Sequence, residues 1–315
     1  MSGPPGSAMP SGEGERYPPP AVLDGVSCSR REVGNLRNIS LRVEQGEWLT
    51  VFGPPGAGKT TLLQVLAGEI EPDEGQVMAR RPLYIPQVPP PPSRGPVRGR
   101  LLQRLAAYGL SPSRSAAGVS LGLEIMGIEA LQEVPERSLT PVQRVLVELA
   151  FAIAAEPPLL LLDDVLTATP EPNRDKLLEY LNGRRAADGL AVVHATCSSR
   201  DAELSDRVLI LDAGEALALE ATGALLRDHA PETVTVEAAD PSSVQRTLRG
   251  IFDVSVVQTR DGLRFTAVNP EDVAAHLFRH PAGGVRVVYS ARGDLWQVHA
   301  ALVNKKRPQP LADQS

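Results

Sequence analysis

The chain is poor in cysteine, carries no excess of positive charge and contains no long apolar run. Its two cysteines, Cys28 and Cys197, are too few and too far apart to suggest a disulfide framework or a zinc site, which fits a reducing compartment. The net charge of -6 argues against a general nucleic-acid binder. Charged or polar residues interrupt the apolar stretches before the roughly 18 residues that a bilayer requires. We therefore expect a cytoplasmic protein that does not cross a membrane by itself and binds no nucleic acid.

What the chain does contain is enough sequence for one large domain and a small one. Its 315 residues, 42% of them hydrophobic and 22% charged, have the composition of an ordinary globular protein that can bury a core. Residues 1–20 are rich in proline and glycine and have no signal-peptide pattern, so we expect a disordered tail there. A second loose tail is expected over residues 306–315.

Strand and helix patterns alternate after the N-terminal tail and predict an α/β domain with a mainly parallel sheet over residues 21–228. A proline-rich segment followed by largely helical sequence interrupts the alternation, which predicts an inserted helical subdomain at about residues 88–150. The strands are expected at residues 39–43, 48–52, 83–86, 158–162, 190–195 and 207–211.

The pattern changes at about residue 231. From there the order is strand, helix, two strands, helix and strand, which predicts a small ferredoxin-like α+β domain over residues 231–305. Its two middle strands are expected to turn at Asp261 and Gly262. A last helix is expected at residues 294–304.

A glycine-rich stretch, GPPGAGKTT, lies between a predicted strand and a predicted helix, and it fits the phosphate-loop motif G-x-x-x-x-G-K-[ST]. Glycines let backbone N–H groups curl around phosphate oxygens, and the start of the helix adds a partial positive charge. Lys59 is expected to hold the β and γ phosphates, and the Thr60 hydroxyl to bind Mg²⁺. A glycine-rich turn with an exposed lysine is the alternative, but it does not explain why motif, strand and helix coincide. The predicted nucleotide-binding residues are Gly53, Pro54, Pro55, Gly56, Ala57, Gly58, Lys59, Thr60 and Thr61.

Two adjacent carboxylates, Asp163 and Asp164, follow the strand predicted at residues 158–162. A phosphate loop needs an aspartate near the Mg²⁺ at the end of a second strand, and Asp163 has that place. Asp164, one residue later, could polarise an attacking water. An acidic strand end or a helix cap is the structural alternative, above all for Asp164. Together with the phosphate loop, the pair predicts a P-loop NTPase site for ATP and Mg²⁺.

The order of motifs along residues 21–225 resembles the ATP-binding-cassette (ABC) family: the phosphate loop, YIPQ, SLTPVQR, LLLLDD and HATCSSRD. The resemblance implies the ABC ATPase fold and a dimer in which each signature loop contacts ATP bound to the partner. It implies that Gln87 takes part in catalysis and metal binding and links the nucleotide to the helical subdomain. It also assigns the catalytic carboxylate to Asp164 and the switch-histidine position to Cys197. The signature positions are Thr140, Pro141, Val142 and Gln143.

Several of these positions depart from the family pattern. Pro141 has no N–H, and Val142 adds a side chain, where the family uses glycine backbone to hold a phosphate. Asp164 retracts its carboxylate by about one bond, roughly 1.5 Å, relative to the family's glutamate. Cys197 is a weak donor that cannot copy an imidazole. We therefore predict an ATP site that is better preserved than its catalytic machinery.

Three further positions bear on the same site. Pro170 stands where the family has an aspartate that crosses the dimer interface. Arg30 stands near the place of an adenine-stacking tyrosine and could stack through its guanidinium, although a solvated arginine is the commoner interpretation. His194 is expected within a strand, three residues before Cys197, which disfavours it as a replacement for the missing histidine.

Two groups of residues elsewhere are candidate sites. His276 and His280 are four residues apart on a predicted helix and could form a metal pair, but no third ligand is evident. Four arginines could face lipid head groups or a permease, although a solvated loop and helix face is the simpler interpretation. They are Arg94, Arg98, Arg100 and Arg104.

The sequence thus predicts the ATP-binding subunit of an ABC transporter, peripheral on the inner face of the membrane, with slow or partner-dependent hydrolysis. Its partners would be an integral membrane permease and a second ATP-binding subunit, in a homodimer or a heterodimer. The C-terminal domain, ending in DLWQVHAAL, resembles the extension of exporter ATPases of the daunorubicin-resistance type, which favours an exporter. One alternative is a switch or scaffold that binds ATP without useful turnover. Another, an ABC protein acting on nucleic acid or ribosomes, usually has two linked cassettes, whereas one is found here.

Overall fold

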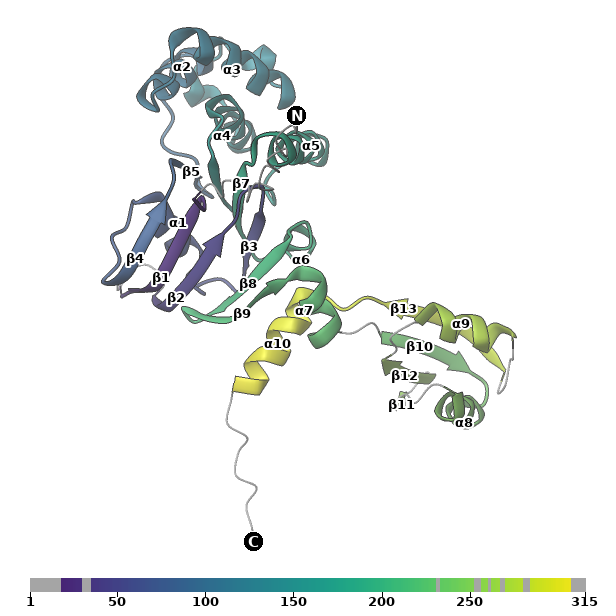
Figure 1. Cartoon of the computed structure of the whole chain (residues 1–315). Coiled ribbons are helices and arrows are strands. Elements are labelled where there is room, and N and C mark those ends of the chain that lie inside the picture. The colour runs from purple at the N-terminus through teal and green to yellow at the C-terminus, as the bar shows by residue number, and fades with distance from the viewer. Residues whose placement is uncertain are drawn as a thin grey trace, which may run out of the picture.

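The computed structural model of the chain describes residues 18–29, 35–230, 233–251, 256–259, 262–266, 270–279 and 284–306. A central body carries a helical lobe at one end and a small second lobe beyond its other end (Figure 1). Most of both expected tails, together with Arg30, Asp261 and His280, lies outside the described residues.

The body is built on a sheet of six strands. In spatial order they are β5 (Pro82–Ile85), β6 (Leu159–Asp163), β7 (Ala191–Thr196), β3 (Trp48–Phe52), β8 (Arg207–Asp212) and β9 (Glu215–Ala221). The first five are parallel, and β9 is an antiparallel edge strand. All residues of β3, β6 and β7 are buried, as expected for parallel strands covered on both faces. The α/β fold with a mainly parallel sheet is confirmed.

A second, antiparallel sheet covers one side of the body. Its strands, in spatial order, are β2 (Leu36–Val43), β1 (Ala21–Cys28) and β4 (Glu74–Ala79). Helix α1 (Lys59–Ala67) lies between the two sheets, since its Leu62 and Leu63 share one core with Ile39 of β2 and Val193 of β7. The sequence predicted part of β2 and neither β1 nor β4. The phosphate loop, which runs from β3 into α1, is therefore fixed by packing on both sides.

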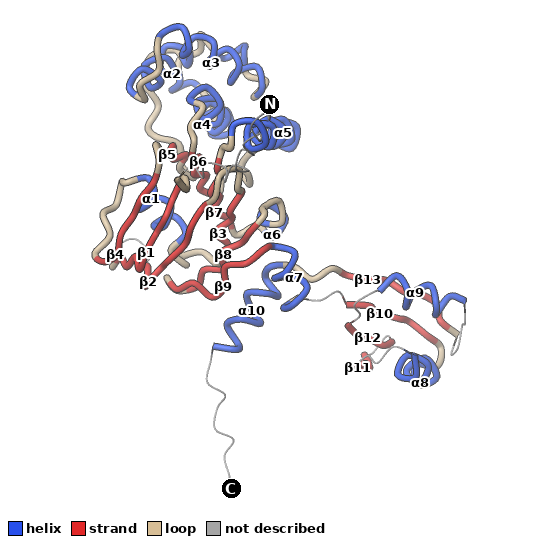
Figure 2. Tube along the Cα trace, viewed as in Figure 1, coloured by secondary structure: helices blue, strands red, loops and turns tan. Residues whose placement is uncertain are grey.

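The helical lobe is inserted between β5 and β6. Its helices are α2 (Val97–Ala107), α3 (Pro112–Ile125) and α4 (Pro141–Ala155), with short 3-10 turns at Glu129–Leu131 and Glu136–Ser138. Helices α3 and α4 touch through their backbones, because a Cβ atom on Gly122 would lie 2.3 Å from the carbonyl oxygen of Ala150. Helix α4 then leads directly into β6, and α5 (Glu171–Asp188) lies beside α4 (Figure 2). The short helix α6 (Ser199–Ala202) follows β7.

The second lobe is a four-stranded antiparallel sheet with two helices. The strands, in spatial order, are β11 (Val256–Thr259), β12 (Gly262–Thr266), β10 (Thr233–Ala238) and β13 (Val285–Ala291). Along the chain, α8 (Pro241–Ile251) follows β10 and α9 (Pro270–Arg279) follows β12. Valines and leucines from these elements, among them Val236, Leu248 and Leu277, form a core separate from that of the body.

The last helix, α10 (Leu295–Lys306), returns to the body beside α7 (Thr222–His229) (Figure 1). Leu295 packs in the core with Phe52 and Leu225, and its N–H donates a hydrogen bond of 3.0 Å to Ser199 Oγ. The rings of Trp296 and Phe52 meet at 4.8 Å between centroids. The region predicted at residues 231–305 is thus divided, because its final helix shares the core of the body.

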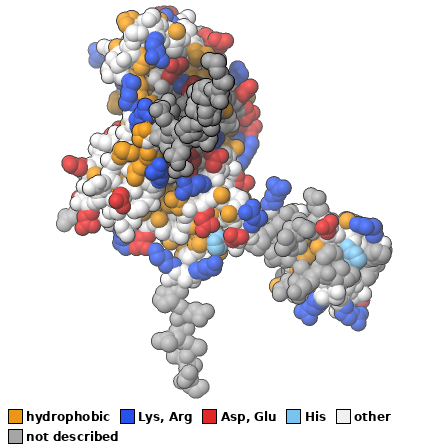
Figure 3. Space-filling view, viewed as in Figure 1, with side chains coloured by type: hydrophobic (Ala, Val, Ile, Leu, Met, Phe, Trp, Pro, Cys, Tyr) orange, Lys and Arg blue, Asp and Glu red, His pale blue; other side chains and the backbone are white. Residues whose placement is uncertain are grey.

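Basic and acidic side chains are interspersed on the face of the body shown in Figure 3. The totals of the two signs are also nearly balanced, with 32 Lys and Arg and 38 Asp and Glu. Among the described residues, no helix is both long and apolar enough to cross a membrane.

Candidate functional site

The phosphate loop depends on glycines at positions where a side chain would collide with its surroundings. A Cβ atom on Gly53 would lie 2.0 Å from the carbonyl oxygen of Leu211, and one on Gly58 would lie 2.9 Å from that of Asn35. Gly58 also has a φ of 103°, which L-residues rarely adopt. Gly56, with a φ of 80°, has no atom within 4 Å of its Cβ position. The loop is therefore packed against the body at Gly53 and Gly58 and is open at Gly56, which leaves room for a phosphate.

Lys59 reaches back over this loop. Its Nζ donates hydrogen bonds to the carbonyl oxygens of Gly53 at 2.8 Å and Pro54 at 2.9 Å. Burial lowers the pKa of Lys59, and neighbouring acidic groups, Cys197 first among them, oppose this shift. An ammonium group has three donors, so one remains for a phosphate oxygen.

Asp163 lies at the buried end of β6 and is 3% exposed. Its Oδ1 accepts a hydrogen bond from Thr60 Oγ1 at 3.2 Å, and its Oδ2 accepts one from Tyr84 OH at 3.0 Å. Burial raises the pKa of Asp163, and the two hydrogen bonds oppose this shift. A hydroxyl and a carboxylate side by side fit Mg²⁺, which prefers oxygen ligands.

Tyr84 was missed by sequence reasoning. It stands on β5, beside Leu161 of β6, and this register brings its hydroxyl to Asp163. Burial, followed by the charge of Asp163, raises the pKa of Tyr84, so its hydroxyl stays protonated. Its place in YIPQ, three residues before Gln87 on a predicted strand, was the available signal.

Asp164 follows Asp163 with a φ of 51°, and its N–H donates to the carbonyl oxygen of Ala195 at 2.8 Å. Its carboxylate accepts hydrogen bonds from three side chains. Gln87 Nε2 donates to Oδ2 at 3.2 Å, while Thr167 Oγ1 and Thr196 Oγ1 each donate to Oδ1 at 2.9 Å. The structure therefore brings Gln87 to Asp164, and it adds two threonines that sequence reasoning did not single out.

Cys197 and His194 lie at different depths in the body. Cys197 directly follows β7 and is partly exposed. His194 is fully buried within β7 and packs edge-on against Trp48, with 6.3 Å between ring centroids. A side chain enclosed in this way does not replace a histidine at the edge of the site.

The signature positions form the start of α4. Thr140 Oγ1 accepts a hydrogen bond from the N–H of Gln143 at 3.3 Å, and Gln143 Oε1 accepts one from the N–H of Thr140 at 2.9 Å. This reciprocal arrangement is a capping box. Pro141 occupies the first helical position, and Val142 is 43% exposed. Thr140 and Gln143 are thus engaged with each other in the single chain.

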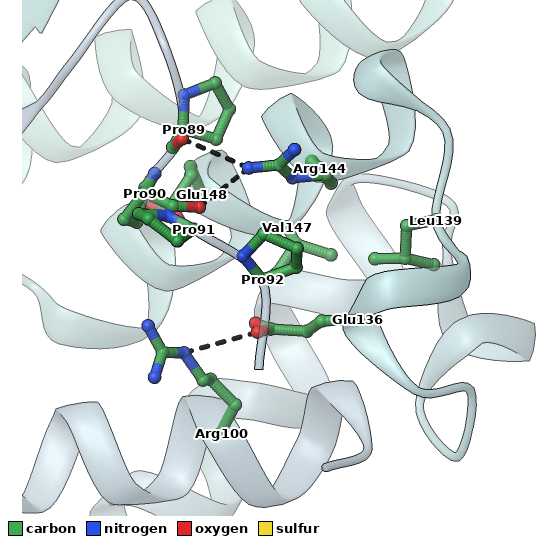
Figure 4. A pocket seen from close by; sticks show the side chains of 10 residues that line it. All are labelled: Pro89, Pro90, Pro91, Pro92, Arg100, Glu136, Leu139, Arg144, Val147 and Glu148. Carbon is green, nitrogen blue, oxygen red and sulfur yellow. Dashed lines mark hydrogen bonds and ion pairs between the residues drawn. The ribbon is translucent and has the colours of Figure 1, made fainter. Parts of the chain in front are cut away.

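The proline run after Gln87, residues 89–92, is hydrogen-bonded to α4 (Figure 4). Arg144, directly after the signature, donates from Nη2 to the carbonyl oxygens of Pro89 at 3.1 Å and Pro90 at 2.7 Å. Of the four candidate arginines, Arg100 pairs with Glu136 at 3.3 Å and Arg104 makes two hydrogen bonds to Glu148, at 2.7 and 2.8 Å. Arg100 and Arg104 therefore form ion pairs within the helical lobe. Of the four, Arg94 and Arg98 remain as candidates for contact with lipid head groups or a permease.

The remaining candidates are placed as follows. Pro170 directly precedes α5, at the helix N-cap position. His276 lies on α9, and its proposed companion His280 is outside the described residues, as is Arg30. Within the described ranges, no three His, Cys, Asp or Glu side chains gather as a metal site would require.

Comparison with known proteins identifies the family. The ABC transporter family model matches residues 36–167. The cobalt import ATP-binding protein of Rhodobacter capsulatus is 32% identical over 222 residues, which cover 62% of this chain and 76% of that protein. The chain belongs to the ABC transporter ATP-binding family.

Other ABC relatives are similar over part of their length. The molybdate/tungstate import ATP-binding protein of Thermococcus kodakarensis is 32% identical over 206 residues, which cover 60% of this chain and 61% of that protein. The sulfate/thiosulfate import ATP-binding protein 2 of Chromobacterium violaceum is 34% identical over 200 residues, 60% of this chain and 54% of that protein. The chain therefore spans between half and two thirds of the length of these two relatives.

Solved structures agree on the fold. An ATP-binding subunit of an ABC transporter has a TM-score of 0.62 and 23% identity, over 66% of this chain and 92% of that chain. An ATP-binding cassette dimer bound to ADP and phosphate has a TM-score of 0.57 and 21% identity, over 64% and 98%. The ABC ATPase form of the P-loop fold is confirmed for the body and the helical lobe.

Proposed function

We propose that this chain is the ATP-binding subunit of a membrane transporter. It would bind ATP and Mg²⁺ at the cytoplasmic face of the membrane, pair with a second ATP-binding subunit and act on a separate integral membrane permease. The observation that carries the proposal is the contact between Thr60 Oγ1 and Asp163 Oδ1, at 3.2 Å, beside the phosphate loop. It joins two residues 103 positions apart in the sequence, each of an expected Mg²⁺ ligand type.

Each group of the site has a role that its geometry supports. The phosphate loop would surround the phosphates with N–H groups, and the free donor of Lys59 would bind the β and γ phosphates. Thr60 and Asp163 would hold Mg²⁺, which neutralises phosphate charge when bound. Asp164 would orient the attacking water and accept its proton through Oδ2, beside Gln87.

Hydrolysis is proposed to be slow, for reasons that lie in the same residues. The Asp164 carboxylate is about one bond shorter than that of a glutamate, and misplacement by about 1 Å can lower a rate on the order of a hundredfold. Cys197 offers a weak S–H donor at the place where the family has an imidazole. ATP binding requires neither residue, so binding is expected to be preserved.

The second ATP-binding subunit would be a copy of this chain or a different ABC protein. Thr140, Pro141, Val142 and Gln143 would face the ATP of that partner. The exporter direction, predicted from the C-terminal region, stays a prediction, since the relatives named above are import proteins. The presence of Cys197 in place of an imidazole and of the shorter Asp164 in place of a glutamate favours one second candidate, a switch that closes on ATP without useful turnover.

A single purification tests these proposals. The tagged full chain is isolated from detergent-solubilised membranes of its own cells, and its associated proteins and ATP turnover are measured with Mg²⁺. We expect a stoichiometric multi-span protein, and a turnover that is low but clearly above that of the Lys59→Ala chain. Asp164→Asn should remove most of this turnover while ATP binding is kept, because the phosphate contacts are unchanged.

The outcomes separate the candidates. A chain that is recovered without a membrane protein contradicts the transporter proposal. ATP-dependent closure with turnover no greater than in Lys59→Ala contradicts hydrolysis and supports the switch.

A further inference from the structure

Asp164 is held from two separate elements at the same oxygen. Thr167, in the loop after β6, and Thr196, at the end of β7, each donate to Oδ1 at 2.9 Å. An sp² oxygen has two lone pairs, so two donors saturate Oδ1. Oδ2 accepts one hydrogen bond, from Gln87 at 3.2 Å, which leaves a second acceptor direction on that oxygen. The carboxylate is therefore turned so that Oδ2 is the oxygen offered to a water.

The two hydroxyl groups are themselves held. Thr196 is fully buried, and its Oγ1 also accepts a hydrogen bond from the N–H of Ser198 at 3.0 Å. Thr167 Oγ1 lies 3.4 Å from Oδ2 of a second carboxylate, Asp201. Asp201 is 2% exposed and is paired with Arg174 Nη1 at 2.9 Å. The Thr167 hydroxyl therefore sits between a carboxylate at the ATP site and a buried ion pair.

The Thr167 hydroxyl has one proton and two carboxylate neighbours. At 2.9 Å, Asp164 is the better acceptor, and at 3.4 Å, Asp201 lies near the limit for a hydrogen bond. The Arg174 partner neutralises Asp201 and so weakens its competition for this proton. The buried ion pair thus holds the loop after β6 while it leaves the hydroxyl proton to Asp164.

We propose that Thr167 and Thr196 are positioning residues for Asp164, and that the Arg174–Asp201 pair keeps Thr167 in place. Two hydroxyls that fix Oδ1 give a short carboxylate the direction that it needs, since small displacements at a reacting group are costly. The catalytic meaning of this arrangement rests on the proposed function, in which Asp164 activates water. The orientation of the carboxylate does not depend on that function.

The test removes the hydroxyls without changing side-chain shape. Thr167→Val, Thr196→Val and the double variant are compared with Thr167→Ser, which keeps the hydroxyl. Thr169→Val is the matched control, because Thr169 is buried in the same loop but donates to the carbonyl oxygen of Val165 at 2.8 Å. Crystal structures of the nucleotide-free chains give the orientation of Asp164, and steady-state kinetics of the full complex give kcat and KM.

We expect the Asp164 carboxylate to rotate away from its wild-type orientation in the valine variants, most of all in the double variant. The kcat should fall by about tenfold to a hundredfold with KM for ATP within about twofold, because the phosphate contacts are untouched. Thr167→Ser should keep the wild-type orientation and kcat, and Thr169→Val should change neither. Melting temperatures show that each chain is folded.

An unchanged Asp164 orientation in the folded double variant would overturn the proposal. So would a loss of kcat in Thr169→Val equal to that in Thr167→Val, since both would then act through folding. If the wild-type complex hydrolyses no ATP, the proposed hydrolysis fails, and the crystal structures still decide the positioning role.

Discussion

His194 places a titratable ring at the centre of the sheet. It stands on β7 opposite Thr50 of β3, fully buried, with Trp48 edge-on against it. Burial lowers the pKa of His194 to about 4, although Asp201 and Asp164 act in the other direction. The folded protein therefore keeps this ring neutral.

A neutral buried histidine makes stability depend on pH. The unfolded chain binds a proton on His194 near the ordinary histidine pKa of 6.5, and the folded chain binds it only near pH 4, so acid between these values favours unfolding. We expect the free energy of unfolding to fall by up to about 3 kcal/mol over this window, with the contribution fully present above it. Urea unfolding of wild type and His194→Leu from pH 8 to 4 measures the difference, because carboxylates common to both proteins cancel. Parallel pH profiles would contradict the assignment.

Residues of the site differ in how far the sequence could predict them. The phosphate loop is a continuous segment, and Asp163 follows a recognisable strand, so spacing along the chain was enough to find them. Tyr84 and Thr196 reach the aspartates from neighbouring strands, and the sheet register that joins them is not visible in local sequence. Thr167 is only three residues from Asp164, but its contact depends on how the loop after β6 folds back. The pairing of Arg104 with Glu148 joins α2 to α4, and the packing of these two helices could not be predicted from a run of arginines.

At the scale of elements, burial on both faces decided which strands could be predicted. Strands β3, β6 and β7 are fully buried and mainly apolar, and they were placed nearly correctly. Strand β1 has register shifts beside Gly25, and β4 is largely exposed, so neither carries a regular alternation. Strand β9, at the sheet edge, has no fully buried residue.

The close contact of α3 and α4 makes a prediction for the helical lobe. Gly122→Ala should push the helices apart and cost about 1 to 3 kcal/mol, because its Cβ would lie 2.3 Å from the Ala150 carbonyl oxygen. Gly183→Ala on α5 is the matched control. A Cβ there meets nothing within 4 Å, so helix propensity should stabilise the chain by about 0.5 to 1 kcal/mol. Thermal unfolding measures both, and equal melting shifts would refute the contact.

At the scale of the whole molecule, α10 ties the second lobe to the body. Its Trp296 rests on Phe52, the residue before the phosphate loop, and its Lys306 pairs with Glu215 of β9. The strands of the second lobe precede α10 in sequence, so this lobe is attached to the body at both of its ends, through α7 and α10. Pairing of two chains around ATP would use a different surface, which includes the exposed start of α4.

The start of α4 gives a prediction for that pairing. Pro141 lacks an N–H, and the N–H of Gln143 donates to Thr140 Oγ1. Two of the first three positions of α4 therefore offer no N–H to a phosphate of the ATP bound by the partner. The double change Pro141→Gly and Val142→Gly restores a donor and removes a side chain. A hydrogen bond to a charged group contributes about 1.5 to 3 kcal/mol, so the ATP-dependent dimer should tighten by roughly tenfold to a hundredfold.

Sedimentation velocity with Mg²⁺ and ATP measures this change. Pro112→Gly is the matched control. Pro112 is the first residue of α3 and follows the N-cap Ser111, much as Pro141 is the first residue of α4 and follows the N-cap Thr140. If dimerisation stays at the wild-type level while ATP affinity is kept, the proline and valine are not what limits pairing, and the surface for the partner lies elsewhere. Suppose instead that the dimer tightens in the double variant and not in Pro112→Gly. The wild-type chain then combines an intact phosphate loop with a signature that weakens ATP binding at its partner's site.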